Sequence, residues 1–141
     1  MSKYYFIGDK IQEVTSDEIA GMFQYSLSLA EKEKTKVTIV VNKLSNSDQF
    51  VKACCDEKYI ARLKRGQSIY NGDIEVQLRS RDGIKQFGEY GVIFGIHLSV
   101  ASLEVIKQRA EAVAVVAIEN SIEEVVNWLA LNGYQSLEKN A

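Results

Sequence analysis

The chain has 141 residues, of which 46% are hydrophobic and 26% are charged, and its formal net charge at pH 7 is −2. This composition is typical of a globular domain, and it excludes a disordered chain and a small protein held together by disulfides. A net charge so near zero also argues against a protein that binds nucleic acid or a membrane surface.

We expect no targeting signal in the N-terminal segment. Its apolar stretch, Tyr4 to Ile7, is shorter than the roughly seven residues that the core of a secretory signal needs. No other segment approaches the roughly 18 apolar residues of a membrane span. We therefore expect a cytoplasmic protein without a membrane segment, folded as one domain over residues 1–141.

Residues 15–34 predict the first helix. Thr15 and Glu18 have the spacing of a capping box, in which each side chain bonds the backbone N–H of the other residue. Apolar residues then recur at helical spacing. The β-branched run KVTIVV at 36–41 follows, and it predicts a buried strand.

A second helix is predicted over residues 47–65, with a break near Asp56 and an end at Gly66. It carries both cysteines of the chain, Cys54 and Cys55. Neighbouring cysteines lack the spacing of metal ligands and do not cross-link separate elements. We therefore expect two free thiols, one buried and one partly exposed, and no metal site.

The dipeptide Asn71-Gly72 lies between two β-type runs, which is the pattern of a type I′ hairpin. After it, Ile74, Val76 and Leu78 alternate with polar residues. We expect these three side chains to face the core and the other face of the strand to contact solvent. The hairpin would then form an antiparallel edge of the sheet.

Two further strands are predicted at residues 92–98 and 112–118, because both runs are apolar on both faces. The helix between them begins after Ser99, and a last helix begins with a second capping box, Ser121 and Glu124. Two such strands joined by a helix form a parallel βαβ unit. The sequence therefore predicts an α/β fold, a three-layer Rossmann-like domain whose mostly parallel sheet has an antiparallel β-hairpin edge.

His97, the only histidine, is predicted near the carboxyl ends of the parallel strands, where ligands bind in such folds. With Ser99 or Ser102 as a hydroxyl and Glu119 or Asp48 as a carboxylate, it would act as a general base. The opposing interpretation is a neutral core histidine inside an apolar strand, beside a serine that only caps a helix. We favour the second interpretation and expect no catalytic residue. The candidates for a catalytic role are His97, Ser99 and Glu119.

The glycines before and within the strand at 92–98 do not form a nucleotide site. Gly88, Gly91 and Gly95 precede or interrupt the strand, whereas a dinucleotide fingerprint follows a strand and opens a helix. There is no Walker A pattern either. We expect no cofactor, and we expect Gly95 to leave room for close packing.

The charges are unevenly distributed along the chain. Residues 58–85 contain seven basic and three acidic side chains, a net charge of +4, and residues 86–141 contain three basic and seven acidic ones, a net charge of −4. Two candidate partner-binding surfaces follow, of which we favour the acidic one. The acidic surface consists of Asp48, Glu119, Glu123 and Glu124, and the basic surface consists of Arg62, Arg65 and Arg79.

The sequence favours a non-enzymatic protein that binds another protein. It contains no metal-ligand set, phosphate loop or nucleophile motif, and a binding protein needs none of these. The sharpest version is an inhibitor or immunity protein that neutralises a partner, for example a toxin, by covering its active surface. The alternative is a small-ligand-binding protein or a hydrolase-like enzyme that uses the strand-end site around His97. An open, deep pocket with an exposed His97 would favour this alternative.

Overall fold

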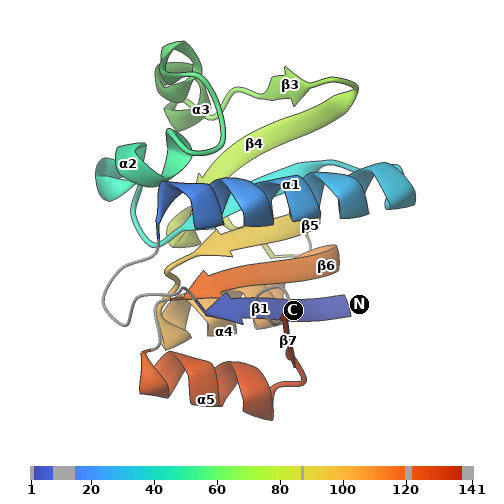
Figure 1. The fold of residues 1–141 in the computed structure, drawn as a ribbon, viewed down its shortest axis with the longest axis vertical. Coiled ribbons are helices and arrows are strands. Elements are labelled where there is room, and N and C mark those ends of the chain that lie inside the picture. The colour runs from blue at the N-terminus through green and yellow to red at the C-terminus, as the bar shows by residue number, and fades with distance from the viewer. Residues whose placement is uncertain (1, 8–14, 87, 120–121, 138–141) are drawn as a thin grey trace.

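A mostly parallel β-sheet runs through the middle of the protein (Figure 1). The computed structural model describes residues 2–7, 15–86, 88–119 and 122–137. Within these ranges the sheet has seven strands, in the order β3-β4-β2-β5-β6-β1-β7. Neighbouring strands are parallel, except for the antiparallel pair β3 and β4. The strands are β1 (Ser2–Ile7), β2 (Val37–Val41), β3 (Ile69–Asn71), β4 (Ile74–Ser80), β5 (Gly88–Ile96), β6 (Ala110–Glu119) and β7 (Gln135–Ser136).

Helices cover both faces of the sheet, and this confirms the predicted three-layer, Rossmann-like α/β fold. One face packs against α1, α2 and α3, and the other against α4 and α5. The helices are α1 (Ser16–Glu33), α2 (Asp48–Val51), α3 (Ile60–Lys64), α4 (Val100–Arg109) and α5 (Glu123–Leu131). Short 3₁₀ turns are η1 (Leu44–Asn46), η2 (Glu57–Tyr59) and η3 (Arg81–Gly83).

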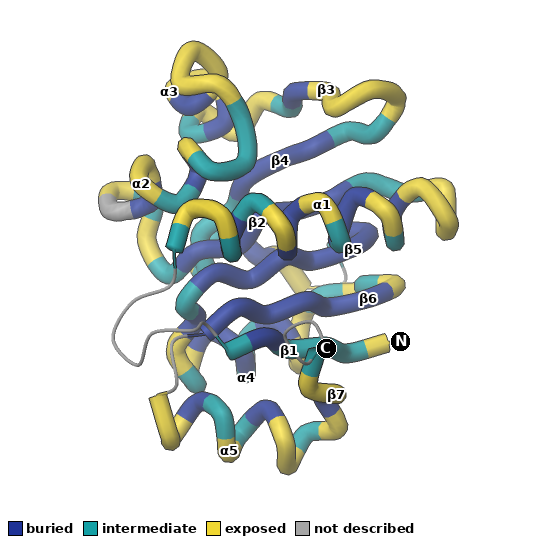
Figure 2. Tube along the Cα trace, viewed as in Figure 1, coloured by how far each residue is buried: buried dark blue, intermediate teal, exposed yellow. Residues whose placement is uncertain are grey.

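Alternation along the central strands divides the core into two halves. Val92 and Phe94 of β5 face α1, whereas Ile93 between them faces α4 and α5. Figure 2 shows that β2, β5 and β6 are buried along most of their length. Burial on both faces explains why these strands consist of nearly continuous apolar runs.

The predicted capping box at the start of α1 is confirmed. Thr15 Oγ1 accepts a hydrogen bond from the Glu18 N–H at 3.1 Å, and Glu18 Oε1 accepts one from the Thr15 N–H at 3.0 Å. The Ser99 side chain likewise caps α4 by accepting from the Ser102 N–H. Helix α5 begins after Ile122, whose side chain makes no capping bond. The capping residue predicted there, Ser121, lies outside the described residues.

The predicted helix over residues 47–65 is two short helices, and the break falls where it was predicted. Asp56 has an extended backbone, with φ −61° and ψ 143°, and it separates the turn after α2 from η2 and α3. Val51 on one side and Ile60 on the other both reach the core on the α1 face. The break therefore lets two apolar anchors contact the same core from different directions.

One expectation about β4 is corrected by the structure. Val76 and Leu78 are buried as predicted, but Gln77 on the opposite face is also buried, with 5% of its surface exposed. Gln77 Nε2 donates to Thr38 Oγ1 at 2.8 Å, and Thr38 Oγ1 donates to the Tyr90 carbonyl oxygen at 2.8 Å. This network satisfies the hydrogen-bonding groups of the buried amide. The face of β4 that was predicted to contact solvent is therefore buried at Gln77, where it forms a polar contact with β2.

The β3–β4 hairpin forms, with its turn one residue further along than predicted. Asn71 pairs with Ile74, so the loop residues are Gly72 and Asp73. Gly72 has φ 60°, whereas Asn71 and Asp73 do not have positive φ. A single positive φ at the first loop residue is a feature of type II′ turns and not of type I′ turns. Because Ile69 pairs with Val76 and both are buried, packing sets this register.

Two alanine substitutions test the turn, because neither added Cβ would meet an atom within 4 Å. Gly72→Ala should lower the free energy of unfolding by about 1 kcal/mol, since φ 60° strains an L-residue. Gly21→Ala, inside α1, should raise it by roughly 0.5–1 kcal/mol. Urea unfolding measures both changes. Equal effects of the two substitutions would contradict the assigned turn.

Candidate functional site

The carboxyl ends of β2 and β5 form a topological switch point. After β2 the chain continues to α2 on the α1 face, and after β5 it continues to α4 on the opposite face. Neighbouring strands whose connections leave on opposite sides open a crevice between them, where ligands bind in open α/β sheets. A cavity of about 360 Å³ lies at this point, lined by Val41, Asn42, Lys43, Phe50, Ile96 and His97.

Asn42, the residue after β2, holds the turn between β5 and α4. Its Nδ2 donates to the His97 carbonyl oxygen at 2.8 Å. Its Oδ1 accepts from the Ser99 N–H at 3.1 Å and from Ser102 Oγ at 2.5 Å. The side-chain amide therefore satisfies polar groups of a turn that does not belong to its own strand. An asparagine directly after a buried strand was the only signal for this role in the sequence.

His97 lies just after β5 and not inside the strand, which corrects the expected placement. Its φ is 51°, in the left-handed region that few residues other than glycine adopt, although histidine is among those found there more often. The ring packs edge-on against Phe50, with ring centroids 5.2 Å apart. It is half-buried and lines the cavity, whereas we expected a buried core residue.

The imidazole of His97 is in an unusual electrostatic position. Its Nδ1 is buried and has no hydrogen-bond partner among the described residues. Burial lowers the pKa of His97, so the ring is neutral at pH 7. The hydroxyls of Ser99 and Ser102 bond Asn42 and each other. The described residues thus contain no serine–histidine pair of the kind that activates a nucleophile.

Glu119, the last residue of β6, is buried with 1% of its surface exposed. Alternation along β6 places it on the face of Val115 and Ala117, whereas the His97 ring contacts Phe50 on the other face. Burial raises the pKa of Glu119 to about 8, and the nearby Leu98 N–H offsets only part of this rise. Within the described chain, neither carboxyl oxygen has a partner with hydrogen-bond geometry.

The predicted acidic surface is divided by the sheet. Asp48 at the start of α2 forms an ion pair with Lys64 at 2.8 Å on the α1 face. Glu123 and Glu124 are exposed at the start of α5 on the opposite face (Figure 1). Glu119 is buried and so offers no charge to a docking partner. The four carboxyl groups therefore do not form one continuous acidic patch.

The three arginines of the predicted basic surface have different environments. Arg62 and Arg65 are exposed on and just after α3, and no described residue forms an ion pair with either. Arg79 instead donates to the Leu78 carbonyl oxygen at 2.8 Å and to Gln77 Oε1 at 3.0 Å. Arg79 is thus engaged within its own strand, and the end of α3 carries the unpaired basic charge.

Gly95 allows the sharp return of the chain at this site. A Cβ on Gly95 would lie 2.5 Å from Leu98 Cδ1, so Leu98 packs directly against the strand, as expected from the glycine. Lys43 and Phe50, which line the cavity, were missed in the sequence because neither residue belongs to a motif. Their contribution depends on the path of the chain after β2.

Comparisons with protein-family models, with curated proteins and with solved structures found no match to this chain. Among the described residues, no group of three or more His, Cys, Asp and Glu side chains could hold a metal ion. In the same part of the chain, no helix is long and apolar enough to cross a bilayer.

The buried carboxyl of Glu119 predicts a pH-dependent stability. In the folded state its pKa is about 8, above its ordinary value of 4.5, so the folded protein keeps a proton that the unfolded chain loses. The resulting stabilisation is complete below about pH 4.5 and is lost as the pH rises towards 8, by about 1 kcal/mol per pH unit. Glu119→Gln should remove this dependence, measured by urea unfolding from pH 5 to 8.

Glu123→Gln is the matched control, because Glu123 is an exposed carboxyl on the next helix. Its free energy of unfolding should follow that of the wild type at every pH. Parallel pH curves for the wild type and Glu119→Gln would show that Glu119 is ionised in the folded protein.

Proposed function

We propose that the protein binds a small ligand in the crevice between the carboxyl ends of β2 and β5. The observation that carries the proposal is the backbone of His97, held in a left-handed conformation at the wall of the cavity by the Asn42 amide. Strained residues of this kind persist where the surrounding structure holds them, and they cluster at binding sites. The location at a switch point adds independent support.

The lining of the crevice indicates the chemical character of this ligand. Val41, Phe50 and Ile96 offer apolar contacts to a hydrocarbon or ring. Lys43 is exposed and has no ion pair among the described residues, and the neutral His97 ring offers a hydrogen bond. A small acid with an apolar body fits this combination, with its carboxylate towards Lys43. The proposal is binding without hydrolysis, since the nearby serine hydroxyls already bond Asn42.

Benzoate is a suitable probe because it joins a carboxylate to a flat ring, and benzamide is its neutral counterpart. Benzoate should shift the NMR signals of Lys43 and Phe50 on titration. Lys43→Ala should weaken benzoate by about 1 kcal/mol, roughly fivefold in Kd, and leave benzamide unchanged. His97→Ala should weaken both probes.

Lys32→Ala is the matched control, because Lys32 is exposed in the last turn of α1. This turn lies towards the amino ends of the parallel strands, away from the crevice. It should leave the benzoate Kd unchanged. An equal loss in Lys32→Ala and Lys43→Ala would indicate general charge attraction and would count against the site. Shifts confined to other parts of the protein would also refute it.

A second candidate function is binding to another protein, including the inhibitor or immunity role that covers the active surface of a toxin. It is favoured by the exposed and unpaired Arg62 and Arg65, which fit an acidic patch on a partner. Of the two candidate surfaces, we now favour the basic one for docking, because two members of the acidic surface are not available: Asp48 is paired and Glu119 is buried. In either proposal the protein is cytoplasmic, where the free thiols Cys54 and Cys55 stay reduced.

Charge reversal tests the second candidate in a quantitative pull-down from the source cell. Arg62→Glu with Arg65→Glu should reduce capture of a specific partner by about tenfold at low salt, with a smaller loss at high salt. Glu123→Lys with Glu124→Lys is the control and should retain the partner. If the partner is lost only from the variant with Glu123→Lys and Glu124→Lys, docking occurs on α5, and the proposal of a basic docking surface is refuted.

A further inference from the structure

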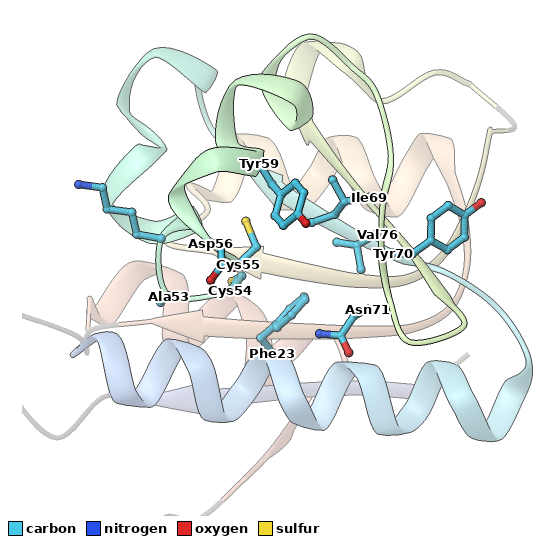
Figure 3. A pocket seen from close by; sticks show the side chains of 11 residues that line it. Phe23, Ala53, Cys54, Cys55, Asp56, Tyr59, Ile69, Tyr70, Asn71 and Val76 are labelled. Atoms are coloured by element: carbon cyan, nitrogen blue, oxygen red, sulfur yellow. The ribbon is translucent and has the colours of Figure 1, made fainter.

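A second cavity lies on the α1 face, between the segment that follows α2 and the β3–β4 hairpin (Figure 3). We refer to it as the hairpin groove, and its volume is about 420 Å³. Its floor consists of Phe23, Ile69 and Val76, all buried side chains of the core on the α1 face. A cavity of this size with an apolar floor accommodates a small ring.

One wall of the hairpin groove is formed by Cys55 and Tyr59 (Figure 3). Burial raises the pKa of the Cys55 thiol, and the adjacent Asp56 carboxylate raises it further, so the thiol stays neutral at pH 7. The Lys58 ammonium lies 5.1 Å from the centre of the Tyr59 ring and covers one of its faces. The wall thus presents an uncharged thiol and an aromatic ring to an occupant.

The rim of the hairpin groove carries polar groups without partners. Asp56 and Asn71 both line it, and Figure 3 shows the Asn71 amide directed towards the Phe23 ring and into the groove. No hydrogen bond or ion pair to another described residue occupies either side chain. The carboxylate accepts hydrogen bonds, and the amide both donates and accepts.

We propose that the hairpin groove binds a planar heteroaromatic ring that carries a hydrogen-bond donor next to an acceptor, as adenine does. The ring stacks on Tyr59 above the apolar floor, which is how proteins hold unpaired bases. The Asn71 amide pairs with the donor–acceptor edge, in the two-bond arrangement that asparagine forms with adenine. The Asp56 carboxylate accepts from the exocyclic amino group. This site is separate from the crevice at His97 and does not depend on its ligand.

Protection of a thiol offers a direct test, because Cys55 lines the hairpin groove and is partly exposed. In a Cys54→Ser background at about pH 9, where more of the Cys55 thiol is ionised and reacts with iodoacetamide, millimolar adenosine should slow the alkylation of Cys55, followed by intact-mass spectrometry. In the same titration, the NMR signals of the Asn71 side-chain amide should shift. Purine riboside, whose base has ring acceptors but no exocyclic amino group or other ring donor, should protect Cys55 less well.

Three variants locate the binding. Tyr59→Leu removes the stacking surface and should raise the Kd for adenosine about tenfold. Asn71→Ala should raise it several-fold and reduce the preference for adenosine over purine riboside. Tyr70 also borders the hairpin groove, but its ring is 68% exposed and points away from the other labelled side chains in Figure 3, so Tyr70→Leu is the matched control. It should leave the Kd within about twofold.

Circular dichroism and the Tm establish that each variant is folded, and the wild-type experiment stands without them. An unchanged rate of Cys55 alkylation in the presence of adenosine would overturn the proposal. Equal protection by adenosine and purine riboside would overturn the assigned role of Asn71 and Asp56. Equal losses in Tyr59→Leu and Tyr70→Leu would show that the ring does not bind in the hairpin groove.

Discussion

The geometry at the carboxyl ends of β2 and β5 depends on one side chain, the amide of Asn42. It joins the end of β2 to the turn after β5, with its N–H groups directed at His97 and its oxygen at Ser99 and Ser102. An amide donates and accepts at once, so it pairs with a carbonyl and with N–H and O–H groups of the same turn. An aspartate would lack the donor and a leucine would lack both groups.

The consequences of this contact extend along the chain in both directions. It holds the carbonyl of His97, and the ring then lies against Phe50 on the face of α1. It also supports the capping serine of α4, which starts on the opposite face. The crevice, the strained histidine and the start of a helix are therefore three results of the same set of hydrogen bonds.

The region at the carboxyl ends of the parallel strands also carries less charge than its composition indicates. Glu119 has a pKa of about 8 and is mostly protonated at pH 7, and the His97 ring is neutral. Asp48 is neutralised by Lys64. Formal charges along a sequence do not include burial and pairing. Among the residues that the structure describes, these effects leave Lys43 as a charge without an ion-pair partner at the cavity.

Local patterns predicted those features of the fold whose partners are close in the sequence. The capping box of Thr15 and Glu18 is an example, and so are the buried runs that became β2, β5 and β6. Features with distant partners were not predictable. Gln77 is buried because Thr38 of another strand accepts its hydrogen bond. The left-handed backbone of His97 has no local signal, because the carbonyl that holds it bonds Asn42.

The position of β1 has a consequence for how the chain folds as it is synthesised. β1 pairs on one side with β6, where Ser2 lies opposite Ala114, and on the other with β7. β1 leaves the ribosome before β6 and β7 and therefore waits for partners that are synthesised later. Contacts between such distant segments slow folding, and they leave backbone groups unpaired in the meantime. In the nascent chain β1 therefore has no β6 to pair with until residues 110–119 have emerged.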